Sequence, residues 1–188
     1  MTGKINRFRI GLWSGVLFLL ILKANCQATI TGTSTDISLT PWTPARNPMA
    51  VFKLDLQSDN SGDVFQSVLV QFNDVGVPNL DSTEIASVAI YRDNGDGNFG
   101  AGDTVLTNGT VNNPAIGSEV TIDFADEYVN TWTENPPGTW SCTYFIVIMA
   151  NTSNIEANDD FTLRITRIGW NYTLSSVPNP PDFTGSYT

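Results

Sequence analysis

The chain has 188 residues, with 19 acidic and 9 basic residues, two cysteines and no histidine, and its formal net charge is −10. Histidine-based catalytic triads and histidine-ligated zinc sites are therefore excluded. The basic residues are few and scattered, which argues against nucleic acid and anionic membrane surfaces as partners.

Residues 1–28 have the layout of a secretory signal peptide. A short positive region precedes an apolar run at 10–22, and small residues follow, so cleavage is expected after Cys26 or Ala28. The apolar run is shorter than the roughly 20 residues of a membrane span. An uncleaved anchor, or a lipoprotein signal in which Cys26 is lipidated, remains an alternative.

Removal of this segment makes the remaining chain more acidic. Four of the nine basic residues and none of the 19 acidic residues lie in 1–28, so five basic residues remain and the net charge becomes −14. We expect one secreted domain, extracellular or at the cell surface, with no membrane attachment after cleavage. Cys142 is then alone and cannot form an internal disulfide, and its apolar surroundings predict a small buried hydrophobe.

Residues 29–49 form an expected N-terminal extended segment. Its first part, 29–40, is rich in threonine but poor in apolar side chains, which is typical of an edge strand. Pro41 and Pro44 end it. Four later segments alternate apolar and polar residues with the period of a half-buried strand, at 50–56, 65–72, 119–124 and 161–168.

The run Trp140–Ala150 is the most apolar segment after the signal. A buried helix is one interpretation, but the residues at 143–148 are strand formers and a Pro-Gly loop precedes them, so we predict a central strand covered on both faces. The tail, 170–188, is rich in proline and serine and is expected along the surface. These segments predict an all-β antiparallel β-sandwich, jelly-roll or immunoglobulin-like, with about seven to nine strands and a body at 50–169.

The segment Ile85–Leu106 predicts a strand, an acidic glycine-rich loop and a return strand. Oxygen-bearing side chains recur in the loop, which suits a structural calcium ion; the candidate ligands are Asp93, Asn94, Asp96, Asn98 and Asp103. The second half of an EF-hand pattern fits, but its first position falls on Arg92, which cannot be a ligand. The alternative is a hairpin loop in which Asp, Asn and Gly serve turn geometry.

Two further kinds of site are suggested by short patterns. Asn108, Asn151 and Asn171 each begin an Asn-x-Ser/Thr sequon, near the ends of expected strands. Trp42 and Trp132 lie in proline-bearing loops, where exposed rings could stack on sugars. The alternative is that these rings cap the ends of the sandwich core.

Catalysis has little support in this sequence, and we expect no enzymatic activity. Neither a Gly-x-Ser-x-Gly elbow nor a glycine-rich phosphate loop is present. Neighbouring carboxylates occur at 123–127 and 159–160, where a chain this acidic is expected to have a solvated face. A small hydrolase that works through Asp and Glu alone is the remaining catalytic alternative.

A family resemblance covers roughly residues 50–168. The series AVFKLDLQSDN, VLVQFNDVG, IASVAIYRDNGDGNFGAGDTVL, YFIVIMAN and DFTLRIT resembles the β-sandwich domains of bacterial and archaeal secreted surface proteins. Its mark is a strand that ends in Tyr-x-Asp, an Asp-Gly loop, then Gly-Asp-Thr and another strand. The resemblance implies a structural or adhesive role without catalysis.

We therefore expect a structural subunit of an extracellular filament, surface layer or matrix. Such a chain would form a homo-oligomer or polymer, with segment 29–40 lent as a strand to the next copy. A carbohydrate-binding or adhesion module that uses Trp42 and Trp132 to bind glycans is the alternative.

Overall fold

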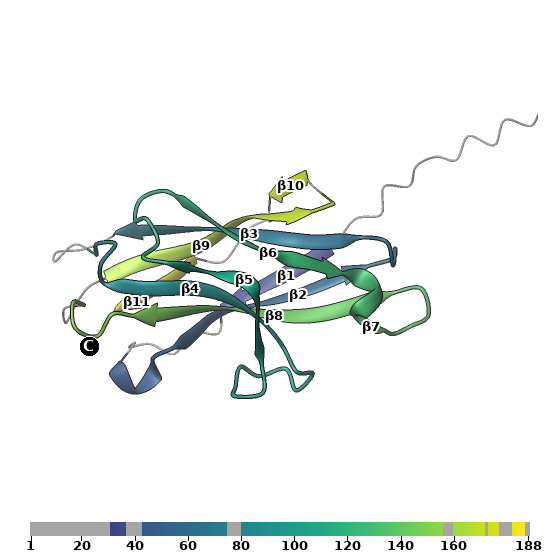
Figure 1. Ribbon diagram of the computed structural model, residues 1–188, viewed down its shortest axis with the longest axis horizontal. Helices are drawn as coiled ribbons and strands as arrows, with labels where there is room; N and C mark the ends of the chain where they lie inside the picture. The colour runs from purple at the N-terminus through teal and green to yellow at the C-terminus, as the bar shows by residue number, and fades with distance from the viewer. Residues whose placement is uncertain are drawn as a thin grey trace, which may run out of the picture.

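The computed structural model describes residues 31–36, 43–74, 80–155, 160–171, 173–176 and 182–186. These residues form two antiparallel β-sheets packed face to face, so the all-β sandwich is confirmed (Figure 1). Their helical turns are two short 3-10 helices, η1 (Pro44–Arg46) and η2 (Val129–Thr131). No helix in this part of the chain is long and apolar enough to cross a membrane.

The first sheet has the strand order β1-β2-β8-β4-β5, and the two-residue β7 pairs with β8. Its central strand β8 lies between β2 and β4, as the apolar run predicted. The strands are β1 (Thr31–Asp36), β2 (Met49–Ser58), β4 (Ile85–Arg92), β5 (Thr104–Asn112), β7 (Thr133–Glu134) and β8 (Trp140–Ala150).

The second sheet has the order β10-β9-β3-β6, and β11 also pairs with β9. Strands β10 and β11 pair with successive parts of β9. The strands are β3 (Val64–Asp74), β6 (Glu119–Tyr128), β9 (Asp160–Trp170), β10 (Thr173–Ser176) and β11 (Asp182–Ser186). The described strands number eleven, against the seven to nine expected, because the short strands β7, β10 and β11 also pair at the sheets.

The main core lies between the sheets and follows the alternation in the sequence. Because successive strand residues face opposite ways, every second residue of β2, β3, β6 and β9 points into this core. The residues expected on these inward faces are buried, and they are Phe52, Leu54, Leu56, Val68, Val70, Phe72, Val120, Ile122, Phe124, Phe161, Leu163 and Ile165.

One residue departs from simple alternation. The pairing of β2 with β8 shifts register between Ala50 and Phe52. Such a bulge places two residues of one strand opposite one of its partner and turns a side chain to the other face. Val51, which alternation alone places outside, is fully buried in the main core.

Both ends of the described chain belong to the sheets. Strand β1 is the edge strand of the first sheet and pairs with β2 from Thr31↔Gln57 to Asp36↔Phe52. In the tail, β10 and β11 extend the second sheet. The sandwich therefore reaches beyond the expected body at 50–169, and the described parts of the tail add two strands to it. The expected signal peptide, 1–28, lies outside the described residues.

The outer face of the first sheet carries a second, smaller apolar cluster. Ala50, Phe145 and Val147 are buried there, with Tyr91 and Phe99 packed against them. Strand β8 is therefore covered on both faces over 144–148, as its composition predicted. The cover on this side comes from the loop between β4 and β5, which lies below the two layers in Figure 1.

Candidate functional site

The acidic loop, residues 93–103, folds through hydrogen bonds to its own backbone. Asp103 accepts from the Asn94 N–H through Oδ1 at 3.0 Å and from the Gly100 N–H through Oδ2 at 2.8 Å. Asp93 accepts from the Gly97 N–H at 3.1–3.2 Å through both oxygens. Side chains of this type hold tight turns by satisfying backbone N–H groups that have no sheet partner.

The same pattern recurs inside the loop. Asn94 Oδ1 accepts from the Asp96 N–H at 3.0 Å, and Asp96 Oδ1 accepts from the Asn98 N–H at 2.8 Å. Gly95 and Gly97 adopt the left-handed backbone, with φ of 104° and 76°, which glycine allows without strain.

An aromatic side chain anchors this loop to the sheet. The Phe99 ring meets the Tyr91 ring edge-on at 5.3 Å between centroids, and the Phe145 ring at 5.8 Å. Both are T-shaped contacts of the kind that aromatic pairs prefer. The loop is thus folded back over the outer face of the first sheet.

The five candidate calcium ligands are all in this loop. Side-chain oxygens of four of them accept from loop N–H groups, and these are Asp93, Asn94, Asp96 and Asp103, whereas the Asn98 amide donates to the Asp96 carbonyl at 3.0 Å. Calcium takes six to eight oxygens around one point. Within the described residues, no group of three or more Asp, Glu, Cys or His side chains is placed to hold a metal ion. The described arrangement fits the turn-geometry alternative, and a carboxylate that accepts from an N–H group still has further lone pairs to offer a cation. Calcium therefore stays a prediction.

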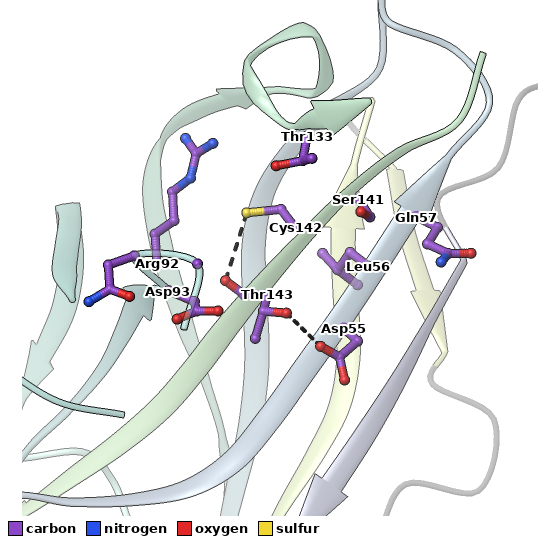
Figure 2. Close-up of a pocket in the computed structure, with 11 residues that line it drawn as sticks. Asp55, Leu56, Gln57, Arg92, Asp93, Thr133, Ser141, Cys142 and Thr143 are labelled. Atoms are coloured by element: carbon purple, nitrogen blue, oxygen red, sulfur yellow. Dashed lines mark hydrogen bonds between the residues drawn. The ribbon is translucent and has the colours of Figure 1, made fainter. Parts of the chain in front are cut away.

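A polar cleft of about 630 Å³ lies beside the start of the loop (Figure 2). It follows two cross-strand rows on the outer face of the first sheet. One row is Gln57–Ser141–Thr133 and the other is Asp55–Thr143, next to Asp93. Directly opposed residues of neighbouring strands share a face, so these side chains form one polar surface.

A second, more apolar hollow of about 400 Å³ lies on the other side of the loop. Met49, Ala50, Phe99 and Phe145 line it together with basic and small residues of η1, β2 and the loop. The loop therefore stands as a ridge between a polar and an apolar depression on one sheet face.

Beside the polar cleft, Arg92 is tied to groups at the end of the sandwich. Its Nη1 lies 3.1 Å from Glu127 Oε2, and its Nη2 donates to the Thr131 carbonyl at 2.8 Å. The buried Tyr144 hydroxyl donates to the same Glu127 oxygen at 3.2 Å. The charge of Arg92 is thus compensated within the protein.

The chemistry of this corner does not favour nucleophilic catalysis. Burial raises the pKa of the Cys142 thiol above its ordinary value, and the thiolate is the nucleophilic form. Burial also raises the pKa of Tyr144. Both groups are therefore protonated at neutral pH.

The expectation that Trp132 offers an exposed ring is wrong. Only 5% of the residue is accessible, and its ring packs edge-on against Tyr144 at 6.1 Å. A buried ring at the end of the sandwich fills the core, which is the alternative that the sequence left open. Trp42 lies outside the described residues.

The three sequons differ in how their asparagines are used. Asn108 is exposed, with φ of 65°. The Asn151 amide donates to the Thr83 carbonyl at 2.9 Å. The Asn171 amide donates to Asp63 Oδ1 at 2.8 Å while its oxygen accepts from the Val64 N–H at 2.8 Å. Among the three, Asn108 therefore has the geometry that best suits a glycan.

Sequence reasoning missed the polar cleft. Asp55, Gln57, Ser141 and Thr143 are the outward residues of two alternating strands, and such residues usually face solvent without a function. The available signal was weak: the outward positions at the facing ends of both strands are polar, but β2 also carries Lys53 and Ser58. The residues of β2 and β8 are more than 80 positions apart in the chain, and only the pairing of these two strands brings them together.

Comparisons with known proteins support the fold only. No protein-family model and no curated protein matches the chain. Among solved structures, the chain is similar to the Hadza microbial sialidase Hz136, with 12% identity and a TM-score of 0.54 over 82% of this chain. The chain spans about 30% of the length of that sialidase. At this identity the likeness concerns the β-sandwich and not the activity.

Two further structures have lower TM-scores and carry no argument about this chain. The CooA pilin subunit from enterotoxigenic Escherichia coli has 17% identity and a TM-score of 0.30, over 85% of this chain and 95% of that one. The collagen-binding subdomain of the Enterococcus faecalis surface protein ACE has 11% identity and a TM-score of 0.23, over 84% of this chain and 94% of that one.

Proposed function

We propose that this chain is a secreted, non-enzymatic structural subunit of an extracellular filament, surface layer or matrix, in which copies join by exchanging strand β1. The observation that carries the proposal is the position of β1. It forms a six-residue ladder with β2 at the sheet edge, and its sequence contains no large apolar residue that would tie it to the core of its own copy.

The chemistry of β1 supports exchange. Its sequence is Thr-Gly-Thr-Ser-Thr-Asp, so its attachment to β2 depends mainly on backbone hydrogen bonds. A ladder of this kind forms equally well with a β1 from another copy, because the same bonds are made. The balance between closed monomers and joined copies then depends on chain concentration and on the connection to η1.

The absence of catalysis is part of the same proposal. The carboxylates near the polar cleft serve structural bonds, since Asp55 accepts from the Thr143 hydroxyl at 2.6 Å and Asp93 accepts from the Gly97 N–H. The raised pKa of Cys142 keeps its thiol protonated. The sequence offers no histidine as a base.

A direct test joins β1 of one copy to β2 of another by a disulfide. Thr33 and Asp55 are partners in the ladder, and Cys142 is first replaced by Ala. One chain carries Thr33→Cys and a second carries Asp55→Cys, and the two are mixed, incubated and oxidised. Exchange predicts a disulfide-linked heterodimer, because each chain has only one member of the pair.

The control mixes the Thr33→Cys chain with an Asp123→Cys chain, whose cysteine lies on β6 of the other sheet. Exchange predicts little cross-linking there. Size-exclusion chromatography of residues 29–188 and 41–188 gives an independent measurement. Monomers in both samples, with no heterodimer in the first experiment, would reject strand exchange.

A further inference from the structure

The polar cleft contains hydrogen-bonding groups that the described fold does not use. Within the described part of the chain, the side chains of Gln57, Ser141 and Thr133 make no hydrogen bond. They nevertheless lie side by side in one cross-strand row. Asp55, which also lines the cleft, accepts from the Thr143 hydroxyl through Oδ1, and its Oδ2 makes no hydrogen bond within the described residues.

The charge of the cleft restricts its ligands. Asp55 and Asp93 border it with negative charge, and the Arg92 guanidinium, which also lines it, is neutralised by Glu127 at 3.1 Å. Lys53 Nζ lies 3.7 Å from Asp55 Oδ1, so this cation is paired as well. An anionic ligand would therefore meet carboxylates and no unpaired cation among the described residues of the lining. Among the described residues that line the cleft there is no aromatic side chain, so they offer flat apolar ligands no ring on which to stack.

The remaining groups match a neutral polyhydroxyl ligand. A carboxylate accepts hydrogen bonds from two adjacent hydroxyls, and a carboxamide both donates and accepts. Hydroxyls such as those of Ser141 and Thr133 do the same. The volume of about 630 Å³ falls in the range of small-molecule sites, about 300–1,000 Å³.

We propose that this cleft binds neutral saccharide units that present adjacent hydroxyls. Asp55 and Gln57 contact one pair of sugar hydroxyls, while Ser141 and Thr133 contact the neighbouring ones. The site is open and lacks a stacking ring, so a single sugar unit binds with a Kd on the order of 1 mM. A repeating glycan gains affinity when several subunits of an assembly bind it together, although the site itself does not depend on strand exchange.

The test is a titration of isotope-labelled chain 29–188 followed by NMR amide shifts. Glucose, galactose and mannose are the neutral probes, and glucuronic acid is the matched anionic probe because it differs from glucose by one carboxylate. We expect at least one neutral sugar to shift the amides of Gln57 and Ser141 with a millimolar Kd, and glucuronic acid to bind at least about tenfold more weakly.

The paired variant is Gln57→Ala with Ser141→Ala, which removes two side chains that hold nothing else in the described fold. We expect it to raise the Kd at least about tenfold with an unchanged melting temperature. The control, Thr121→Ala with Asp123→Asn, alters exposed residues of β6 on the other sheet and leaves the Kd unchanged.

Several outcomes would overturn the proposal. One is the absence of any amide shift with a neutral sugar at a concentration of about 100 times the expected millimolar Kd. The others are equal Kd values for glucose and glucuronic acid, and an unchanged Kd in the Gln57→Ala, Ser141→Ala variant. Calcium chloride alone shifting the same amides, while the sugars do not, would assign the cleft to a cation instead. None of these outcomes bears on the heterodimer test of strand exchange.

Discussion

Replacement of Asp103 by Ala tests what the acidic loop is built to do. In the structure its two oxygens accept from the Asn94 and Gly100 N–H groups at 3.0 and 2.8 Å, closing the loop from both sides. Hydrogen bonds to a charged group contribute about 1.5–3 kcal/mol each when buried. Because these two N–H groups are exposed and water can replace the carboxylate, we expect a total loss of about 1–2 kcal/mol.

For a chain of this size, that loss lowers the melting temperature by about 2–8 °C. The measurement is thermal unfolding of chain 29–188 in EDTA, repeated in excess calcium chloride. Asp123→Ala is the control, since this exposed carboxylate lies on β6, and it changes stability by less than about 0.5 kcal/mol. An Asp103→Ala loss that appears only in calcium would refute the turn-closing role and establish the carboxylate as a metal ligand.

Four further predictions follow from contacts in the structure. Phe99→Ala removes two aromatic contacts and uncovers Phe145, so urea unfolding should show a loss of about 1–3 kcal/mol; a loss below about 0.5 kcal/mol would mean that the loop does not rest on the sheet. Gly169→Ala places a Cβ 2.1 Å from Ser67 Oγ and should destabilise by about 1–3 kcal/mol, while the added change Ser67→Ala should restore most of it. Hydrogen bonds from Thr166 and Arg167 lower the pKa of Glu119 below its ordinary value of 4.5. The stabilising contribution of ionised Glu119 is therefore complete above pH 4.5 and is lost as the pH falls through its lower, folded-state pKa. Glu119→Gln should reduce the loss of stability in acid. An unchanged dependence of stability on pH would contradict this. In a host that glycosylates asparagine, intact mass should show a glycan that Asn108→Gln removes, whereas Asn171→Gln should leave the mass of the glycan unchanged.

The strands and their buried faces could be predicted from local sequence. In β2, β3, β6 and β9 the apolar residues recur at every second position, and burial on one face of a sheet requires that period. The bulge before Phe52 could not be predicted in this way, because it depends on how β2 meets β8. The same limit applies to β10 and β11, whose polar sequences gain their strand geometry from the edge of β9.

Some features of the candidate sites could likewise be predicted from local sequence, and others depended on the fold. The acidic loop was found because its composition is unusual over a few residues. The role of Phe99 was missed, since a single aromatic residue in a polar loop gives no local sign of the surface it covers. For Trp132 the sequence left open whether the ring is exposed or caps the core, and only its packing onto Tyr144 decides for the core.

The sequence by itself determined the class of the protein: apolar residues at period two require sheets, and the lack of histidine with an excess of carboxylates limits the chemistry available. Tertiary structure alone decided which polar residues meet. The pairing of β2, β7 and β8 brings Gln57, Thr133 and Ser141 into one row, and the fold of the loop onto the sheet separates two depressions. Pairing between distant strands depends on the summed contacts of the whole sandwich, which no short segment encodes.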